Sequence, residues 1–230
     1  MPSLLALDSS TDTMALALVA PGQTQVFEAQ GGAQASARML PEVKALLAGA
    51  GMQMADLDAI AFGQGPGAFT GLRTACAVAQ GLALGLDKPV LAIDSLMLVA
   101  EDARAQGAGD DVWVAMDARI GEIYAARYRW ADAAWQVVEA PALYAPEVLA
   151  AHWGQPACVA GTALAEYVAA LGTLPGAWPQ ARSRAAALGT LALAAWQRGE
   201  TRDAAEALPV YVRDKVALTT AEREQKAAAS

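Results

Sequence analysis

One short segment near the start of the chain combines an acid with hydroxyl groups at the expected end of a strand. An apolar run over Leu4–Asp8 ends in Asp8 and continues into Ser9, Ser10 and Thr11. Such a turn can hold Mg²⁺ through water on the carboxylate, and phosphate through backbone N–H groups and hydroxyls. Phosphate sites usually have glycine here, because the backbone must approach the ligand closely. Two interpretations stay open: a weakened phosphate site, or an ordinary turn closed by Asp8 and Thr11.

A second segment, residues 63–75, is rich in glycine and proline and lies between an expected strand and an expected helix. Its glycines and proline are Gly63, Gly65, Pro66, Gly67 and Gly71, with Phe69 among them. Thr70 is suited to cap the helix, and a helix start with Arg73 nearby can bind an anion. The segment lacks the Lys-Ser/Thr ending of a phosphate-binding loop and the spacing of a dinucleotide fingerprint. Neither class of nucleotide site is supported by this loop alone.

The helix expected after this loop carries small residues at every fourth position. These are Gly71, Ala75, Ala79 and Ala83, and Leu72, Cys76 and Leu82 add apolar area beside them. A smooth face of this kind lets another backbone approach closely. The residues alone leave open whether that backbone belongs to the chain's own sheet or to another molecule.

Other chemistry is limited by the scarcity of soft ligands. The chain has one histidine, His152, and two cysteines, Cys76 and Cys158. These are too few for a zinc site, which argues against a metallopeptidase, and a His-based triad would have to use His152. Both cysteines lie in apolar patterns and are expected to be buried hydrophobic residues. His152 is expected at a surface or a helix end.

Composition limits the function further. Of 230 residues, 55% are hydrophobic and 17% charged, which predicts a large core in one large domain or two small ones. The formal net charge of −8 would repel a phosphate backbone, so a free-standing nucleic-acid binder is not expected. We find neither a signal peptide nor an apolar run long enough to span a membrane, and expect a cytoplasmic protein.

The pattern of elements in the first half predicts three short strands, at residues 4–8, 14–20 and 24–29. A helix follows, whose apolar face contains Met39, Leu40, Val43 and Leu47. Strands at 57–62 and 89–93 then alternate with helices at 70–85 and from Ser95 onward. The predicted order is three strands, then helix, strand, helix, strand and helix.

The second half repeats this order, and Asp117 follows Asp8 by 109 residues, close to half the chain. Strands are expected at 112–117, 122–129, 135–139 and 157–160, and helical segments at 146–151, from Leu164 and at 184–198. We therefore predict an α/β fold of two ribonuclease-H-like domains with mixed sheets flanked by helices, the actin-like (ASKHA) architecture. The expected domains are residues 1–105 and 106–220, with a frayed tail at 221–230.

Taken together, two motifs resemble the bacterial TsaB (YeaZ) family. They are LLALDSSTDTMALAL at the N-terminus and AFGQGPGAFTGLRTACAVAQGLALGLDKPVLAIDSLMLVA in the middle of the first half. MDARIGEIYAARY and LPVYVRDKVA, further along, are similar to that family's segments in the same order. The resemblance covers about residues 3–217, and its most specific part is GPGAFTGLR.

The resemblance implies a non-catalytic subunit of the machinery that forms N6-threonylcarbamoyladenosine in tRNA. Members pair with the TsaD transferase and assemble with the TsaE ATPase. The catalytic relative holds iron or zinc through two histidines on one helix, a site that His152 alone cannot supply. The implied cofactor content is none bound tightly, with weak binding of ATP or ADP with Mg²⁺ at a subunit junction. The implied contact with tRNA is through the complex only.

The resemblance also implies where partners bind. In the family, the helix after the glycine-rich loop and the helix before it form the dimer contact. Carried onto this chain, the interface is Met39, Leu40, Val43, Leu47, Thr70, Gly71, Leu72, Arg73, Ala75, Cys76, Ala79, Gln80 and Ala83. The small-residue face thus becomes an expected intermolecular contact, used for a homodimer when the partner is absent. The motif loop itself is Gly65, Pro66, Gly67 and Phe69.

Two further expectations concern the second half. Asp117, with Asp8, Ser9, Ser10 and Thr11, would belong to a vestigial nucleotide site, although Arg119 and Ile120 leave little room for phosphate. Residues 209–214 are expected to form a terminal edge strand with a capping ion pair. The alternative function is an actin-like ATPase or small-molecule kinase that acts alone through Asp8, Ser10 and Asp117.

Overall fold

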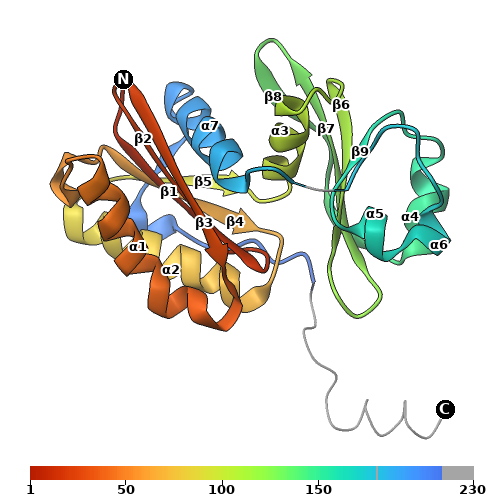
Figure 1. Ribbon diagram of the computed structural model, residues 1–230, viewed down its shortest axis with the longest axis horizontal. Coiled ribbons are helices and arrows are strands. Elements are labelled where there is room, and N and C mark those ends of the chain that lie inside the picture. The colour runs from red at the N-terminus through yellow and green to blue at the C-terminus, as the bar shows by residue number, and fades with distance from the viewer. Residues whose placement is uncertain (180, 214–230) are drawn as a thin grey trace, which may run out of the picture.

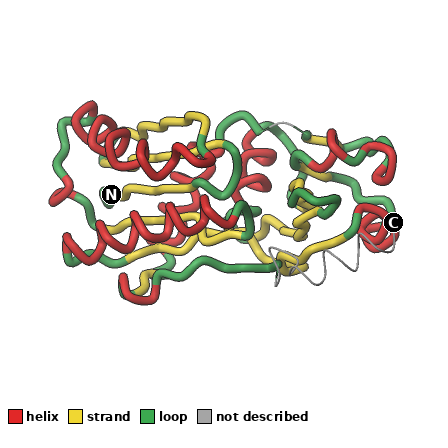
Figure 2. Tube along the Cα trace, turned by 90° about the horizontal axis from the view of Figure 1, so that it is seen from below, coloured by secondary structure: helices red, strands yellow, loops and turns green. Residues whose placement is uncertain are grey.

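The chain folds into two lobes that lie side by side, each built around a mixed β-sheet (Figure 1). The computed structural model describes residues 1–179 and 181–213. Seen from below, the two lobes follow one another along the long axis (Figure 2). The tail expected at residues 221–230 lies outside the described residues. Within them, no helix is long and apolar enough to cross a membrane.

The sheet of the first lobe has six strands in the order β11-β5-β4-β1-β2-β3. Their bounds are β1 Leu4–Asp8, β2 Thr13–Ala20, β3 Gln23–Gln30, β4 Ala59–Gly65, β5 Val90–Asp94 and β11 Thr201–Arg202. β1, β4 and β5 are parallel, and the other pairs are antiparallel. Every residue of β1 is buried, because helices cover both faces of the sheet. The predicted meander of three strands, followed by two strands that alternate with helices in a mixed sheet, is confirmed.

Helices α1 (Ala35–Gly49) and α2 (Phe69–Leu86) cover one face of this sheet. Their buried side chains join those of the strands in one core, in which α1 contributes Met39, Val43 and Leu47. Two short 3₁₀ helices, Gly32–Gln34 and Met54–Asp56, connect these elements to the strands. The apolar face of α1 that the periodicity predicts is therefore the side that packs in the core of its own lobe.

Helix α7 (Arg184–Gln197) covers the opposite face of the first sheet, which corrects the predicted division of the chain. The sequence predicts a second domain over residues 106–220. Leu188 and Leu191 of α7 instead pack against Leu4 and Val19 of the first sheet, and β11 pairs with β5. This face of the sheet is apolar and must be covered, and the chain returns from the second lobe to cover it.

The second lobe repeats the meander of the first in a sheet of order β10-β9-β6-β7-β8. Its strands are β6 Asp111–Asp117, β7 Ile123–Ala131, β8 Ala134–Tyr144, β9 Val159–Ala160 and β10 Ala177–Trp178. Helices α4 (Pro146–Trp153), α5 (Ala163–Glu166) and α6 (Val168–Leu171) contribute to the core on one face. The predicted repeat of three antiparallel strands is confirmed.

Helix α3 (Met97–Ala105) lies between the lobes, and its buried residues pack against the second sheet and against α7. A partly buried hydrogen bond joins the lobes at the same place. The hydroxyl of Tyr128 in β7 donates to the carboxylate of Asp94 at the end of β5, at 2.7 Å. Burial raises the pKa of Asp94, and this hydrogen bond opposes the rise. The lobes are thus held at their base by packing and by this polar contact.

Candidate functional site

Asp8 ends β1 at the edge where the parallel strands of the first sheet terminate, and its carboxylate is completely buried. Arg184, the first residue of α7, donates from Nη2 to Asp8 Oδ1 at 3.1 Å. Ser10 donates to the same oxygen from its hydroxyl at 2.9 Å, and Ser95 donates to Oδ2 at 3.0 Å. Each carboxylate oxygen is therefore occupied by groups of the chain itself.

Sequence reasoning identifies Asp8 and Ser10 but misses Arg184 and Ser95. Arg184 is only 5% exposed, although it is an arginine in a helix that is otherwise almost entirely apolar. A single arginine in an apolar helix could have identified Arg184 as a site residue, since a buried guanidinium needs a carboxylate partner. Arg184 also donates to the hydroxyl of Ser10 at 3.0 Å, which joins the four side chains in one network. Arg184 Nε is buried with no hydrogen-bond partner among the described residues.

The glycine-rich loop packs directly on the turn that follows Asp8. A Cβ atom at Gly67 would overlap the backbone of Ser10, and one at Gly71 would overlap the carbonyl oxygen of Ser9. The hydroxyl of Ser9 donates to the carbonyl oxygen of Gly71 at 2.8 Å, and Ala68 N–H donates to the Ser10 carbonyl at 2.7 Å. The close backbone approach that these glycines permit is thus made by the turn that follows Asp8.

The turn after β6 in the second lobe is built differently. Asp117 accepts hydrogen bonds at Oδ1 from Arg119 N–H and from the hydroxyl of Tyr167, both at 2.8 Å. Burial and this hydrogen bond raise the pKa of Tyr167 to about 12. Arg119, Ile120 and Gly121 all have left-handed backbone conformations, with φ of 65°, 57° and 75°. For a β-branched residue such as Ile120 this conformation is strained.

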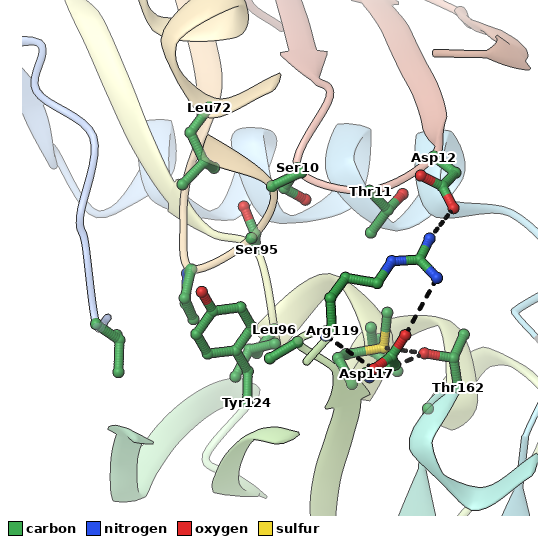
Figure 3. Close-up of a pocket in the computed structure, with 18 of the residues that line it drawn as sticks. Ser10, Thr11, Asp12, Leu72, Ser95, Leu96, Asp117, Arg119, Tyr124 and Thr162 are labelled. Atoms are coloured by element: carbon green, nitrogen blue, oxygen red, sulfur yellow. Dashed lines mark hydrogen bonds and ion pairs between the residues drawn. The ribbon is translucent and has the colours of Figure 1, made fainter. Parts of the chain in front are cut away.

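A cavity of about 520 Å³ lies between the two turns and is lined by residues of both lobes. Figure 3 shows Thr11 and Asp12 of the first turn opposite Asp117 and Arg119 of the second, with Tyr124 nearby. The guanidinium of Arg119 bridges the mouth, because it pairs with Asp12 of the first lobe and with Asp117 of its own turn. The structure therefore brings the two predicted halves of the site together across one cavity.

The Mg²⁺–nucleotide chemistry of an actin-like enzyme does not fit these residues. That chemistry needs a carboxylate that can bind metal through water. Asp8 is sealed against Arg184 and the two serines, and Asp117 is engaged by Arg119 and Tyr167. Among the described residues there is also no cluster of three or more His, Cys, Asp or Glu side chains that could hold a metal. The cavity remains, and Asp117 in its wall is held by Arg119 and Tyr167.

The remaining polar and sulfur-containing candidates are structural. His152 is exposed at the end of α4 and contacts a carboxylate oxygen of Glu139 at 2.7 Å, which confirms its expected place at a helix end. Cys76 and Cys158 are buried and unpaired, as predicted. Burial raises the pKa of both thiols, so neither resembles an activated nucleophile.

The predicted interface residues divide into two sets. Most face the chain's own core: Met39, Val43, Leu47, Gly71, Leu72, Ala75, Cys76, Ala79 and Ala83 are buried. Gln80 is partly buried and donates to the carbonyl oxygen of Ala204 in the 3₁₀ helix Ala204–Glu206 at 3.0 Å. Only Leu40, Thr70 and Arg73 are exposed. The prediction that the small-residue face contacts a partner is therefore wrong, because that face packs on β4 and β1 of its own sheet.

The outer sides of the same helices carry a different apolar surface, which we call the outer α1–α2 face. Its exposed residues are Leu40, Ala77, Gly81 and Leu84, with Leu40 and Leu84 40% and 59% exposed. Ala77, Gly81 and Leu84 are spaced so that they share one side of α2. A shallow hollow between the helices, lined by Ser36, Thr74 and Val78 among others, adjoins this face. The sequence pattern does not distinguish this side from the buried one.

The two mixed sheets, the repeated meander and the cavity between the lobes define a ribonuclease-H-like fold of the actin-like (ASKHA) class. Comparison with known proteins identifies a family within this fold class. Residues 16–222 match the family model described as TsaD: tRNA N6-adenosine threonylcarbamoyltransferase. The chain is 35% identical over 147 residues to the tRNA threonylcarbamoyladenosine biosynthesis protein TsaB of Escherichia coli, and 39% identical over 122 residues to the TsaB protein of Haemophilus influenzae.

A solved structure, YeaZ from Pseudomonas aeruginosa, superposes with a TM-score of 0.83 at 40% identity, covering 92% of this chain and 100% of that one. The matches cover 64% and 52% of the lengths of the two TsaB proteins, and 64% and 53% of this chain. The chain belongs to the TsaB (YeaZ) family.

Proposed function

We propose that this chain acts in the biosynthesis of threonylcarbamoyladenosine in tRNA, as a non-catalytic cytoplasmic subunit that pairs with a TsaD-type transferase and assembles with a TsaE-type ATPase. The names of its relatives and the match to a TsaD family model support this role. Its task is to hold the transferase in a competent geometry, which is a binding role.

The observation that carries the proposal is the sealed carboxylate of Asp8. An actin-like enzyme would use this side chain next to its nucleotide, whereas here it is fully buried and neutralised by Arg184. Opening the pair would leave an uncompensated charge in the core, which is strongly unfavourable. A chain that uses its phosphate turn to fix α7 on the sheet is suited to binding and not to phosphate chemistry.

The outer α1–α2 face is the surface that we assign to the transferase partner. Its exposed leucines offer apolar contact area, and the small residues Ala77 and Gly81 between them permit close helix packing. A second copy of the chain would present the same surface, so a homodimer in the absence of the partner uses it too.

In this proposal, the binding of tRNA and of nucleotide depends on the partner subunits. The net charge of −8 leaves the positive surface for tRNA to other subunits. We propose no tightly bound cofactor, and assign any ATP or ADP with Mg²⁺ to weak binding at a junction between subunits.

Co-elution with the transferase on a sizing column tests the proposal. Leu84→Arg places a charge on the outer α1–α2 face and is expected to abolish co-elution. Val148→Arg is the matched control, since Val148 is 57% exposed on α4 of the other lobe against 59% for Leu84. Both variants should retain the wild-type circular dichroism spectrum. Undiminished co-elution of Leu84→Arg would show that the partner binds elsewhere.

One observation favours the alternative of an ATPase or kinase that acts alone: the cavity between the lobes has a volume typical of small-molecule sites. This alternative predicts ATP turnover by the isolated chain. Because Asp8→Ala is expected to perturb the fold, Asp117→Asn is the more informative variant. Turnover above background that Asp117→Asn removes would establish the enzyme, whereas absence of turnover in the wild-type chain would eliminate it.

A further inference from the structure

The last described segment, Leu208–Arg213, crosses from one lobe to the other, and we call it the C-terminal strap. The sequence predicts an edge strand here, but the segment makes no ladder with a neighbouring strand among the described residues. Val210 N–H donates at 2.6 Å to the carbonyl oxygen of Gln64, the residue before the last one of β4. A Cβ atom at Gly65 would lie 2.6 Å from the Val210 carbonyl oxygen, so glycine is needed for the strap to lie here.

At its first-lobe end, the strap is attached to the start of α2. The ring of Tyr211 lies 4.9 Å from that of Phe69, measured between centroids. The guanidinium of Arg73 lies 3.8 Å from the Phe69 centroid, and its Nε donates to the Tyr211 hydroxyl at 3.0 Å. Arg73 is exposed on the outside of α2, so this attachment is accessible from the side on which a partner would approach.

At its second-lobe end, the strap is attached to the turn between β6 and β7. Arg213 donates from Nη2 to the carbonyl oxygens of Ala118 and Arg119, at 3.0 and 3.3 Å, and to the carboxylate of Glu122 at 2.6 Å. The side chain of Arg213 is 14% exposed. Val212 packs against the core of the second lobe. One side chain thus fixes the turn that carries Asp117 and Arg119.

The strap also forms part of the wall of the cavity between the lobes, to which Val210, Tyr211, Val212 and Arg213 all contribute. The closed arrangement is not fully satisfied, because Arg213 Nε is buried with no hydrogen-bond partner among the described residues. An unsatisfied buried donor costs free energy that opening would recover. The strap therefore combines attachments to both lobes with one buried donor that has no partner among the described residues.

We propose that the C-terminal strap is a latch, which holds the two lobes closed over the cavity and is released from the outside of α2. A protein partner that presents a carboxylate to Arg73 would take the guanidinium from Phe69 and Tyr211, and the loss of this attachment would loosen the contacts of Arg213 with the second lobe. Closure of the lobes is then coupled to the binding of a partner on the outside of α2. The release by a partner rests on the proposed function, whereas the attachment of the two lobes by the strap does not.

Hydrogen exchange of the full chain alone, followed by mass spectrometry, tests the latch. Arg213→Ala is expected to speed exchange at least roughly tenfold at Val210 and in residues 118–122, because charge-assisted hydrogen bonds are lost. Arg73→Ala is expected to speed exchange in residues 118–122 as well, although none of the contacts found for Arg73 reaches that turn. Arg38→Ala is the matched control, since Arg38 pairs with Glu42 on its own helix α1, and should leave both regions unchanged.

Two results would overturn the latch. One is unchanged exchange in residues 118–122 in Arg213→Ala; the other is an effect of Arg73→Ala confined to the start of α2. If Arg213→Ala does not fold, Tyr211→Ala replaces it, because it cuts the strap from α2 and leaves Arg213 and Glu122 in place. These outcomes concern the chain alone, so they are distinguishable from failure of the proposed function, which co-elution decides.

Discussion

The β1–β2 turn and the β6–β7 turn occupy equivalent places in the two lobes, and each begins with an aspartate. Asp8 is completely buried and is held by α7, a helix that arrives from the far end of the chain. The Asp117 side chain is 13% exposed, lines the cavity and is held by Arg119 of its own turn and by Tyr167. The first carboxylate fixes the core, whereas the second organises the mouth of the cavity.

The difference shows that equivalent positions in a repeated fold need not have equivalent roles. A carboxylate in the core must be neutralised, and removing one partner of such a pair is strongly destabilising. A carboxylate that lines a cavity keeps some contact with water, so its interactions are weaker than those of a completely buried pair. The two aspartates therefore differ in burial and partners: Asp8 lies in a buried ion pair, whereas Asp117 lines the cavity.

The largest effect is expected when each aspartate is replaced by alanine. Asp8→Ala leaves Arg184 buried without its partner and should lower the free energy of unfolding by about 3–5 kcal/mol. Asp117→Ala loses hydrogen bonds to a carboxylate but leaves no buried guanidinium without a partner, and should lower it by about 1.5–3 kcal/mol. Urea denaturation of both variants measures the two values.

A double variant provides the control for this prediction. Asp8→Asn combined with Arg184→Met removes both charges, and the amide oxygen introduced at position 8 keeps an acceptor for Ser10. Most of the stability should therefore return, because no buried charge is left without a partner. Equal losses for the two alanine variants would contradict the distinction between the turns.

The next effect separates the two sides of α2. Gly71→Ala forces a methyl group into the carbonyl oxygen of Ser9 and should destabilise the chain by roughly 1–3 kcal/mol. Gly81→Ala is the control within the same helix, because nothing lies within 4 Å of a Cβ atom there. It should stabilise the chain by about 0.5–1 kcal/mol, since alanine is the better helix former. Thermal unfolding that shifts both variants in the same direction would argue against the packing of α2 on the Ser9–Ser10 turn.

The smallest effect concerns the second turn alone. The pKa of Tyr167 is raised to about 12, first by burial and then by its hydrogen bond to Asp117. Because the folded-state pKa lies above the unfolded value of about 10, this group stabilises the chain below pH 10, and that contribution is lost as the pH rises through 12. Asp117→Asn should lower the Tyr167 pKa without restoring the ordinary value, because burial remains.

The titration of Tyr167 can be followed by ultraviolet absorbance of the phenolate, taken as the difference between the chain and its Tyr167→Phe variant. An unchanged pKa in Asp117→Asn would mean that the two side chains do not interact in solution.

Local features of the fold could be predicted from the sequence, because they depend on neighbouring residues. The fully apolar run of β1 and the repeated meander marked the sheets. The position of α7 could not be predicted, because its helical pattern says that one side is buried but not which sheet buries it. Its partner in the buried ion pair, Asp8, is 176 residues away in the chain.

The site could be predicted only in part, for the same reason. Asp8 and Asp117 are identified by their turns, but the burial that separates their roles depends on Arg184 and Ser95, which are distant in sequence. The small-residue side of α2 was misassigned, because close packing on a sheet and close packing on a partner require the same residues. The burial of these residues against the chain's own sheet, with Gly71 against Ser9, decides between them.

The most direct test of the account is transfer of the threonylcarbamoyl group to tRNA, reconstituted from TsaD-type and TsaE-type partners with and without this chain. We predict that transfer requires the chain and proceeds close to the wild-type rate with the Asp8→Asn, Arg184→Met double variant. A group in acid–base catalysis would be worth roughly 10²–10⁴-fold. A loss of that size in a double variant that folds and still co-elutes with the transferase would contradict a purely binding role.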